Sequence, residues 1–299
     1  MRRWNSETLL EAQGKFSVPS LLSRLTITMP QPIPLDYHMH STFSEDGHAS
    51  IREMCLAAVE RQIPEIGFSE HLDQHPNDVV SINFYRPDEW WQEIRNAREE
   101  FAGHLIVRAG MEAGESHRYP VKVQALARDY PYDYIIGSLH YDGDHFLFDP
   151  EYLQQTSPEE ILHSYFSEVE QMTRQPLFDI LGHLDLPVRN ARHIWEAYDP
   201  AHYEDLIRGI LRNCLDHGLA LDVNVAGLRK PSQNIMPHPA ILRWFRKMGG
   251  ERVTLGSDAH SADQVGAHLD RAVNAVRAAG LKFVTCFERR QARLVPLED

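Results

Sequence analysis

Short apolar segments alternate with longer amphipathic stretches along the chain from Leu35 onward. The apolar segments are about five residues long, which is the length expected for strands that are buried on both faces of a parallel sheet. The predicted strands are Leu35–His38, Glu65–Ser69, Leu105–Gly110, Asp133–Ser138, Phe178–Gly182, Leu219–Val223 and Val253–Ser257.

The amphipathic stretches between these strands predict helices. The sequence Ser-Pro-Glu-Glu from Ser157 is typical of a helix start, because the serine can cap the backbone and proline suits the first turn. Gly218 and Gly280 are suited to the position just after a helix end. The predicted helices are Ser50–Arg61, Pro87–Phe101, Ser157–Arg174, Pro200–His217, Pro237–Lys247 and Ser261–Ala279.

Seven β–α units in series favour a closed or nearly closed parallel barrel over an open sheet. We therefore predict an α/β fold with a single catalytic domain over residues 34–299, where neither a repeat nor a break in composition occurs. Residues 1–33 are predicted to be a flexible N-terminal extension. Their Glu7, Glu11 and Lys15 interrupt any apolar core that a signal peptide would need, and Met29–Pro34 is typical of an extended linker.

The overall charge limits the kind of partner. A formal net charge of −13 argues against broad binding to nucleic acid or to an anionic membrane, since both require a basic surface. A small phosphate ester remains compatible if bound cations make the pocket positive. No apolar stretch approaches the ~20 residues that span a bilayer. The scattered cysteines Cys55, Cys214 and Cys286 form no disulfide pattern, which predicts a cytoplasmic location.

Potential metal ligands gather where the predicted strands end. His38 and His40 stand two apart on a strand and therefore point to the same face, where they can bind one ion together. A lone histidine at a strand end is more often a hydrogen-bonded or exposed residue than a metal ligand. Here, however, six of the seven predicted strands end with a potential ligand, and in a barrel these ends share one mouth. The candidate ligands are His38, His40, Asp46, His71, Glu112, His140, His183, Asp258 and His260.

The ligand types indicate the chemistry. Imidazole nitrogens mixed with carboxylates suit Zn²⁺, Mn²⁺ or Fe²⁺ better than Mg²⁺ or Ca²⁺, which prefer oxygen ligands. The candidates are too many for one tetrahedral ion, so we predict two or three divalent ions. Such a cluster generates hydroxide near neutral pH and holds the oxygens of a phosphoryl group during in-line displacement. The sequence therefore predicts a metal-dependent phosphatase.

The motifs DYHMHS, SEHLD, GME, GSLHY, GHLD and GSDAH resemble those of the polymerase and histidinol phosphatase (PHP) superfamily, over nearly all of the chain after the extension. The resemblance implies a distorted (β/α)7 barrel with three ion sites. Some family members have histidine where Asp46 stands, which leaves the metal preference of that site open. The implied sets are His38, His40, Glu112 and Asp258 for the first ion, Glu112, His140 and His183 for the second, and Asp46, His71 and His260 for the third.

Within the superfamily, the segments GHLDLPVR (182–189) and LDVNVAGLRK (221–230) make the chain most similar to the histidinol phosphatases. That likeness implies hydrolysis of L-histidinol phosphate to L-histidinol and phosphate by a metal-bridged hydroxide, a late step of histidine biosynthesis. Two alternatives stay open. One is a phosphoesterase of the same superfamily that acts on another phosphomonoester or a nucleotide, and the other is an inactive accessory or metal-storing module.

Residues near the predicted mouth are candidates for contacts with substrate or with the ligands. Arg189 and Arg229 follow strand ends, where a guanidinium can fork onto phosphate oxygens, although either can instead be a surface arginine. Asn224 is expected to contact substrate or to orient Arg229, and His260 is a candidate proton donor. Three carboxylates are expected to accept the second N–H of metal-bound histidines, namely Asp36, Asp73 and Asp185.

Overall fold

The computed structural model describes residues 33–297. The predicted extension therefore lies almost wholly outside the described residues, and its flexibility stays a prediction. Six parallel strands pair side by side in the order β1-β2-β3-β6-β7-β8. These strands are β1 (Glu65–Leu72), β2 (Ile106–Gly114), β3 (Ile136–Ser138), β6 (Ile180–Leu181), β7 (Ala220–Asn224) and β8 (Val253–Gly256).

The first predicted strand, Leu35–His38, closes this sheet instead of forming a regular strand. Asp36 makes a parallel bridge to β1, and Met39 makes one to the chain just after β8. The Tyr37 N–H donates to the carbonyl of Leu255 in β8 at 2.8 Å. Because residues 35–40 are hydrogen-bonded on both sides, the sheet curls into a ring, and the predicted distorted (β/α)7 barrel is confirmed.

Helices cover the outside of the barrel, and their ends follow the predicted signals. Ser157 and Glu160 form the expected capping box at the start of α5, and Gly218 ends α7 with a φ of 67°. The helices are α1 (Ile51–Glu60), α2 (Pro87–Glu100), α3 (Pro120–Asp129), α4 (Pro150–Gln155), α5 (Pro158–Arg174), α6 (Arg192–Ala197), α7 (Glu204–His217), α8 (Pro239–Lys247) and α9 (Leu269–Ala278).

Several elements differ from the prediction. The helix predicted over Ser261–Ala279 starts only at Leu269, because His268 before it has a φ of 64° and cannot continue a right-handed helix. The helices α3, α4 and α6 were not predicted; α4 and α6 have six residues each, and helices of so few turns depend on tertiary packing. Two hairpins were also missed, β4 (Tyr141–Asp142) with β5 (His145–Phe146) and β9 (Phe283–Glu288) with β10 (Gln291–Pro296).

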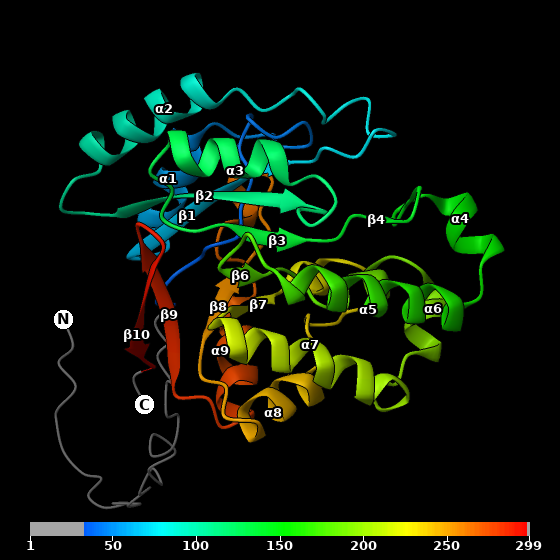
Figure 1. The fold of residues 1–299 in the computed structure, drawn as a ribbon. Coiled ribbons are helices and arrows are strands. Elements are labelled where there is room, and N and C mark those ends of the chain that lie inside the picture. The colour runs from blue at the N-terminus through cyan, green and yellow to red at the C-terminus, as the bar shows by residue number, and fades with distance from the viewer. Residues whose placement is uncertain (1–32, 298–299) are drawn as a thin grey trace, which may run out of the picture. The chain divides into compact units, whose positions relative to one another are not determined.

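The two ends of the barrel carry different connections. The arrows of β2 and β3 point toward β4 and α4 in Figure 1, whereas the β9–β10 hairpin lies at the opposite end. The turn of that hairpin is attached there by the Arg290 N–H, which donates to the carbonyl of Asp133 just before β3. The carboxyl ends of the strands, and the ligands predicted on them, therefore face the β4–α4 side.

The barrel interior is filled by two stacked tyrosines. The rings of Tyr37 and Tyr134 lie 4.8 Å apart, and the Tyr134 hydroxyl donates to the Tyr37 carbonyl at 2.6 Å. Gly67 in β1 and Gly110 in β2 make room for this pair, because a Cβ at either position would lie 2.2 Å or 2.4 Å from the Tyr134 side chain. Trp90 and Trp91 are buried in the core.

Within residues 33–297, the helices are too short or too polar for any of them to cross a membrane.

Candidate metal centre

The predicted ligands converge on Glu112, which β2 carries to the mouth of the barrel. Glu112 is fully buried, although an isolated carboxylate at such a depth would be strongly disfavoured. Five imidazole rings surround its two oxygens. The nitrogen–oxygen distances are 3.0 Å to His183, 3.1 Å to His71, 3.2 Å to His38, 3.4 Å to His40 and 3.4 Å to His140.

Two further carboxylates extend the cluster toward the surface. Asp258 Oδ1 lies 3.5 Å from His40 Nε2 and 3.6 Å from His260 Nδ1. Asp46 lies between two rings, 3.0 Å from His260 Nε2 and 3.7 Å from His71 Nε2. All nine predicted ligands therefore form one continuous group, although they come from segments up to 222 residues apart (260 − 38).

The donor atoms of this group fit metal ions. His38 Nε2, His40 Nε2, His71 Nδ1 and Glu112 Oε2 are buried and have no hydrogen-bond partner. Unpaired buried polar atoms are rare in folded proteins because each one loses its interactions with water. Divalent cations would satisfy them, since neutral imidazole and carboxylate are the ligands that Zn²⁺ and its neighbours prefer.

The implied partition of the ligands among three ions stays a prediction, and the contacts point to two further candidate ligands. Glu112 Oε1 lies within 3.4 Å of both His140 and His183, as the implied second site requires. A carboxylate oxygen of Glu45 lies within 4.8 Å of ligand atoms of Asp46 and His71. A carboxylate oxygen of Asp73 lies within 4.8 Å of ligand atoms of His71 and His140. Glu45 was not predicted, because it precedes Asp46 in a loop where no strand period marks the face on which a side chain lies.

Burial and mutual charge shift the titration of these groups. Burial lowers the pKa of His40 to about 3, with help from the charges of His71 and His260. Burial alone would also lower the pKa of His71, but the Glu112 carboxylate and then Asp46 and Asp73 raise it to about 10. Burial would raise the pKa of Glu112, and the neighbouring histidines instead hold it well below its usual range. The close approach of imidazole and carboxylate therefore favours the charged form of Glu112 and of His71, while His40 stays neutral.

Carboxylates on the far side of two rings set their tautomers. Asp222 Oδ2 lies 2.8 Å from His38 Nδ1, and Asp73 Oδ1 lies 2.9 Å from His140 Nδ1. Each ring thus turns its Nε2 toward Glu112, the arrangement usual for metal-bound histidines. The expected role of Asp73 agrees with this contact. Asp222 was missed, although it stands two residues before Asn224 on β7 and so faces the same side.

The other two predicted carboxylate partners are wrong. Asp36 accepts the backbone N–H groups of Ser257 and Gly266, each at 2.9 Å, and so ties together the chain segments that follow β8. Asp185 accepts the N–H of His238 at 2.8 Å and the Tyr198 hydroxyl at 3.2 Å. Both carboxylates are fully buried; the backbone donors occupy both oxygens of Asp36, whereas those of Asp185 occupy only Oδ2, and its Oδ1 has no hydrogen-bond partner.

The two predicted arginines line the mouth beside Asp258. Arg189 Nη1 donates to Asp258 Oδ2 at 2.9 Å, while its buried Nε has no partner. Arg229 donates to the carbonyls of Ser257 and Asp258 at 2.7 Å and 2.8 Å. That Asn224 contacts substrate or orients Arg229 stays a prediction; its fully buried amide donates to Asp222 at 3.2 Å and to Asp258 at 3.4 Å.

A cavity of about 700 Å³ opens over the metal ligands and both arginines. Three apolar side chains at its rim are unusually exposed: Val79 by 82%, Val80 by 65% and Phe146 by 40%. The cavity therefore combines a floor of metal ligands, two guanidinium groups and an apolar rim. Such a pocket suits a small anionic ester with an organic leaving group.

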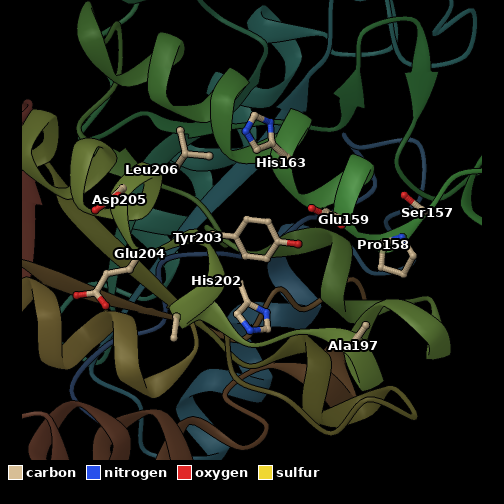
Figure 2. A pocket seen from close by; sticks show the side chains of 11 residues that line it. Ser157, Pro158, Glu159, His163, Ala197, His202, Tyr203, Glu204, Asp205 and Leu206 are labelled. Atoms are coloured by element: carbon tan, nitrogen blue, oxygen red, sulfur yellow. The ribbon is translucent and has the colours of Figure 1, made fainter.

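A second cavity of about 850 Å³ lies between α5 and the start of α7. Figure 2 shows Tyr203 at its centre, with His163 and His202 on either side. Although this cavity is the larger one, it contains none of the predicted site residues, and His163 and His202 belong to none of the candidate metal groups. We therefore assign the chemistry to the mouth of the barrel.

The fold and the metal-ligand cluster define a class of protein. Residues 36–226 match the PHP domain family. The chain is 31% identical over 260 residues to a probable histidinol-phosphatase of Deinococcus radiodurans, covering 85% of this chain and 97% of that one. This chain belongs to the PHP domain family.

Two relatives from Lactococcus lactis and Listeria monocytogenes add detail. The histidinol-phosphatase of L. lactis is 27% identical over 256 residues, covering 85% of this chain and 94% of that one. The crystal structure of histidinol phosphate phosphatase from L. lactis, complexed with zinc, L-histidinol and phosphate, superimposes with a TM-score of 0.80 at 26% identity, over 87% of this chain and 98% of that one. The crystal structure of the putative histidinol phosphatase from L. monocytogenes shares the fold, with a TM-score of 0.70 at 21% identity over 79% of this chain and 99% of that one.

Proposed function

We propose that this chain is a metal-dependent phosphoric monoester hydrolase of the histidinol-phosphatase type, which converts L-histidinol phosphate and water into L-histidinol and phosphate. The observation that carries the proposal is the group of nine ligands, six of them buried, with unpaired ligand atoms directly beside Arg189 and Arg229. The substrate follows from similarity to relatives named for this activity, one of them solved with zinc, L-histidinol and phosphate.

We infer that the cluster holds two or three divalent ions, with Zn²⁺, Mn²⁺ and Fe²⁺ as the metals that its nitrogen and oxygen donors favour. When bound, such ions supply Lewis acidity toward phosphoryl oxygens and lower the pKa of water. The proposed sets are His38, His40, Glu112 and Asp258, then Glu112, His140 and His183, then Asp46, His71 and His260.

The chain's own residues would hold the substrate in place. Arg189 lines the cavity and would place its guanidinium beside a phosphate oxygen, while Asp258 fixes one edge of that group. Arg229 is fixed by two carbonyls and would add positive charge beside the phosphate. Val79, Val80 and Phe146 would shield the organic part of the ester from water.

His260 is positioned to move a proton. Its Nδ1 lies 2.9 Å from the carbonyl of Asp258, so Nδ1–H donates there and Nε2 faces Asp46. Burial lowers the pKa of His260, but the hydrogen bond to Asp46 and the charge of Asp258 raise it above the usual value. With two ions bound elsewhere, a protonated His260 would lie at the cavity wall and donate to the leaving alkoxide.

We place this activity in one domain of residues 34–299, acting on a small substrate rather than on nucleic acid, in keeping with the net charge of −13. Cys55, Cys214 and Cys286 are buried and unpaired, which supports a cytoplasmic location.

The test is phosphate release from L-histidinol phosphate by protein loaded with Mn²⁺ or Zn²⁺. We expect a kcat/KM of roughly 10⁴ M⁻¹s⁻¹ or more, abolished in His140→Ala and retained in the matched control His104→Ala, whose side chain is exposed and outside the cavity. Metal-dependent turnover of a nucleotide or another ester, without release from L-histidinol phosphate, would overturn the substrate and leave the metal-dependent phosphatase.

A further inference from the structure

Glu70 is a buried carboxylate that the metal cluster does not use directly. It stands next to His71 on β1, so its side chain points to the opposite face of the strand. Both of its oxygens are occupied by donors: the Ser41 hydroxyl at 2.6 Å, the Ser44 hydroxyl at 2.7 Å, the Ser41 N–H at 3.0 Å and the Trp90 indole N–H at 3.1 Å. A carboxylate with this set of donors acts as a fixed hydrogen-bond acceptor.

Ser44 connects this carboxylate to two of the metal ligands. Its Oγ accepts the backbone N–H of His71 at 3.0 Å and lies 3.3 Å from Nδ1 of His40. A hydroxyl has one hydrogen to donate and two lone pairs to accept with. Because Glu70 takes the hydrogen, the oxygen must accept from His40, and Nδ1 of that ring must carry its proton.

The position of His40 makes this tautomer important. Its ring stacks between those of His71 and His260, with centroids 4.2 Å and 4.4 Å away. Its Nε2 lies 3.4 Å from Glu112 and 3.5 Å from Asp258 and has no hydrogen-bond partner. Only the Nδ1–H tautomer leaves a lone pair on Nε2 for an ion at this place.

We propose that Glu70 and Ser44 are positioning residues, which through one hydroxyl fix the tautomer of His40 and the backbone of His71 so that both ligands are prepared for metal. Asp222 and Asp73 hold His38 and His140 by direct contact, whereas Glu70 acts on His40 across Ser44. The inference rests on the metal centre of the proposed function, but not on the identity of the substrate.

The experiment compares Zn²⁺ binding by the full-length wild type, Ser44→Ala and Glu70→Gln, measured by competition with a chelator. We expect the affinity of the weakest zinc site to fall 10- to 100-fold in Ser44→Ala, in the range usual for the loss of a group that orients a ligand. Ser41→Ala is the matched control, because it removes an equal hydroxyl from the same carboxylate without contact to a metal ligand's ring. We expect it to stay within threefold of the wild type.

A second measurement is independent of affinity. Ring ¹⁵N NMR of the metal-free protein should show Nδ1 of His40 protonated in the wild type and in Ser41→Ala, and a mixture of tautomers in Ser44→Ala. Equal zinc affinity of Ser44→Ala and Ser41→Ala, or an unchanged His40 tautomer in Ser44→Ala, would overturn the inference. If Glu70→Gln does not fold, the comparison of Ser44→Ala with Ser41→Ala still tests the inference.

The outcomes also separate this inference from the proposed function. A wild type that binds less than one zinc ion per chain would overturn the metal centre itself. A wild type that binds zinc but hydrolyses a different ester would overturn the substrate, and the comparison of Ser44→Ala with Ser41→Ala would stand unaffected.

Discussion

The two ends of the barrel both bury carboxylates, but they satisfy them in opposite ways. At the amino ends of the strands, Asp133 accepts from Arg98 Nη2 at 2.6 Å and from the N–H groups of Ala109 and Arg289 at 2.9 Å and 3.1 Å. Asp179 accepts twice from Arg290, at 2.7 Å and 3.1 Å. At the carboxyl ends, Glu112 has no guanidinium partner among the described residues; it accepts the Ser138 hydroxyl and faces imidazole rings, and the facing nitrogens of His38, His40 and His71 have no hydrogen-bond partner.

This difference in hydrogen bonding indicates the role of each end of the barrel. The amino end is complete in itself, because every acid just described has a guanidinium or a backbone N–H, and Glu65 likewise pairs with Arg108 at 2.8 Å. The carboxyl end is complete only when cations are added, since several of its buried imidazole nitrogens and carboxylate oxygens have no hydrogen-bond partner. The first end stabilises the fold, and the second prepares a site at the expense of local stability.

The largest effect should follow from removing the centre of the carboxyl end. Glu112→Gln keeps the size of the side chain but removes the charge that five imidazoles share. We expect a loss of at least about 10³-fold in kcat/KM, equivalent to about 4 kcal/mol, together with a fall in bound metal. Metal analysis and phosphate release measure the two effects. Full metal content in Glu112→Gln would contradict the bridging role.

The amino end should respond in stability and not in metal binding. Asp133→Ala leaves Arg98 and two N–H groups without their acceptor, so we expect the free energy of unfolding to fall by about 3 kcal/mol. Urea denaturation measures this change, and metal content per folded chain should equal that of the wild type. A variant that loses metal while keeping its stability would show that the two ends are not independent.

An intermediate effect is expected at the cavity wall. Arg189→Ala should lower kcat/KM about 30-fold, equivalent to about 2 kcal/mol, and weaken inhibition by inorganic phosphate in parallel. Arg192→Ala is the matched control, because that arginine is 79% exposed on α6 and pairs with Glu196. Unchanged inhibition by phosphate in Arg189→Ala would remove this arginine from the substrate site.

The smallest effect concerns an acid outside both ends. Burial would raise the pKa of Glu168 on α5, but its hydrogen bonds with His117 and Arg118 lower it to about 2. A lowered folded-state pKa adds stability at pH values above about 4.5, and this contribution disappears as the pH falls toward about 2. Allowing for partial solvent screening, we expect Glu168→Gln to lower stability by about 1 kcal/mol at pH 7.

The pH series provides the check on Glu168. Urea denaturation of the wild type and Glu168→Gln should give curves that differ at pH 7 and approach each other between about pH 5 and pH 3. A difference that stays constant over this range would mean that the ion pair adds nothing to stability.

Much of the fold and of the ligand set could be predicted from the sequence, because both depend on local spacing. Apolar runs of strand length give the barrel strands, and a residue's place at the end of such a run determines that it faces the mouth. This reasoning located His38, His40, Glu112 and Asp258 without any knowledge of their contacts. The short helices and hairpins escaped it, since their few residues gain stability only from packing.

The tertiary structure alone decided how the ligands are held. The pairing of Asp222 with His38 joins residues 184 apart, and Ser44 meets Glu70 across 26 residues, so no local pattern reveals either contact. Asp36 and Asn224 both lie near the ends of strands that lead to the site. In the closed barrel, however, Asp36 accepts backbone N–H groups, and the Asn224 amide lies behind the ligands. The alternation of residues along a strand determines the face on which a side chain lies. Its contact partner depends on which strands the barrel brings next to each other.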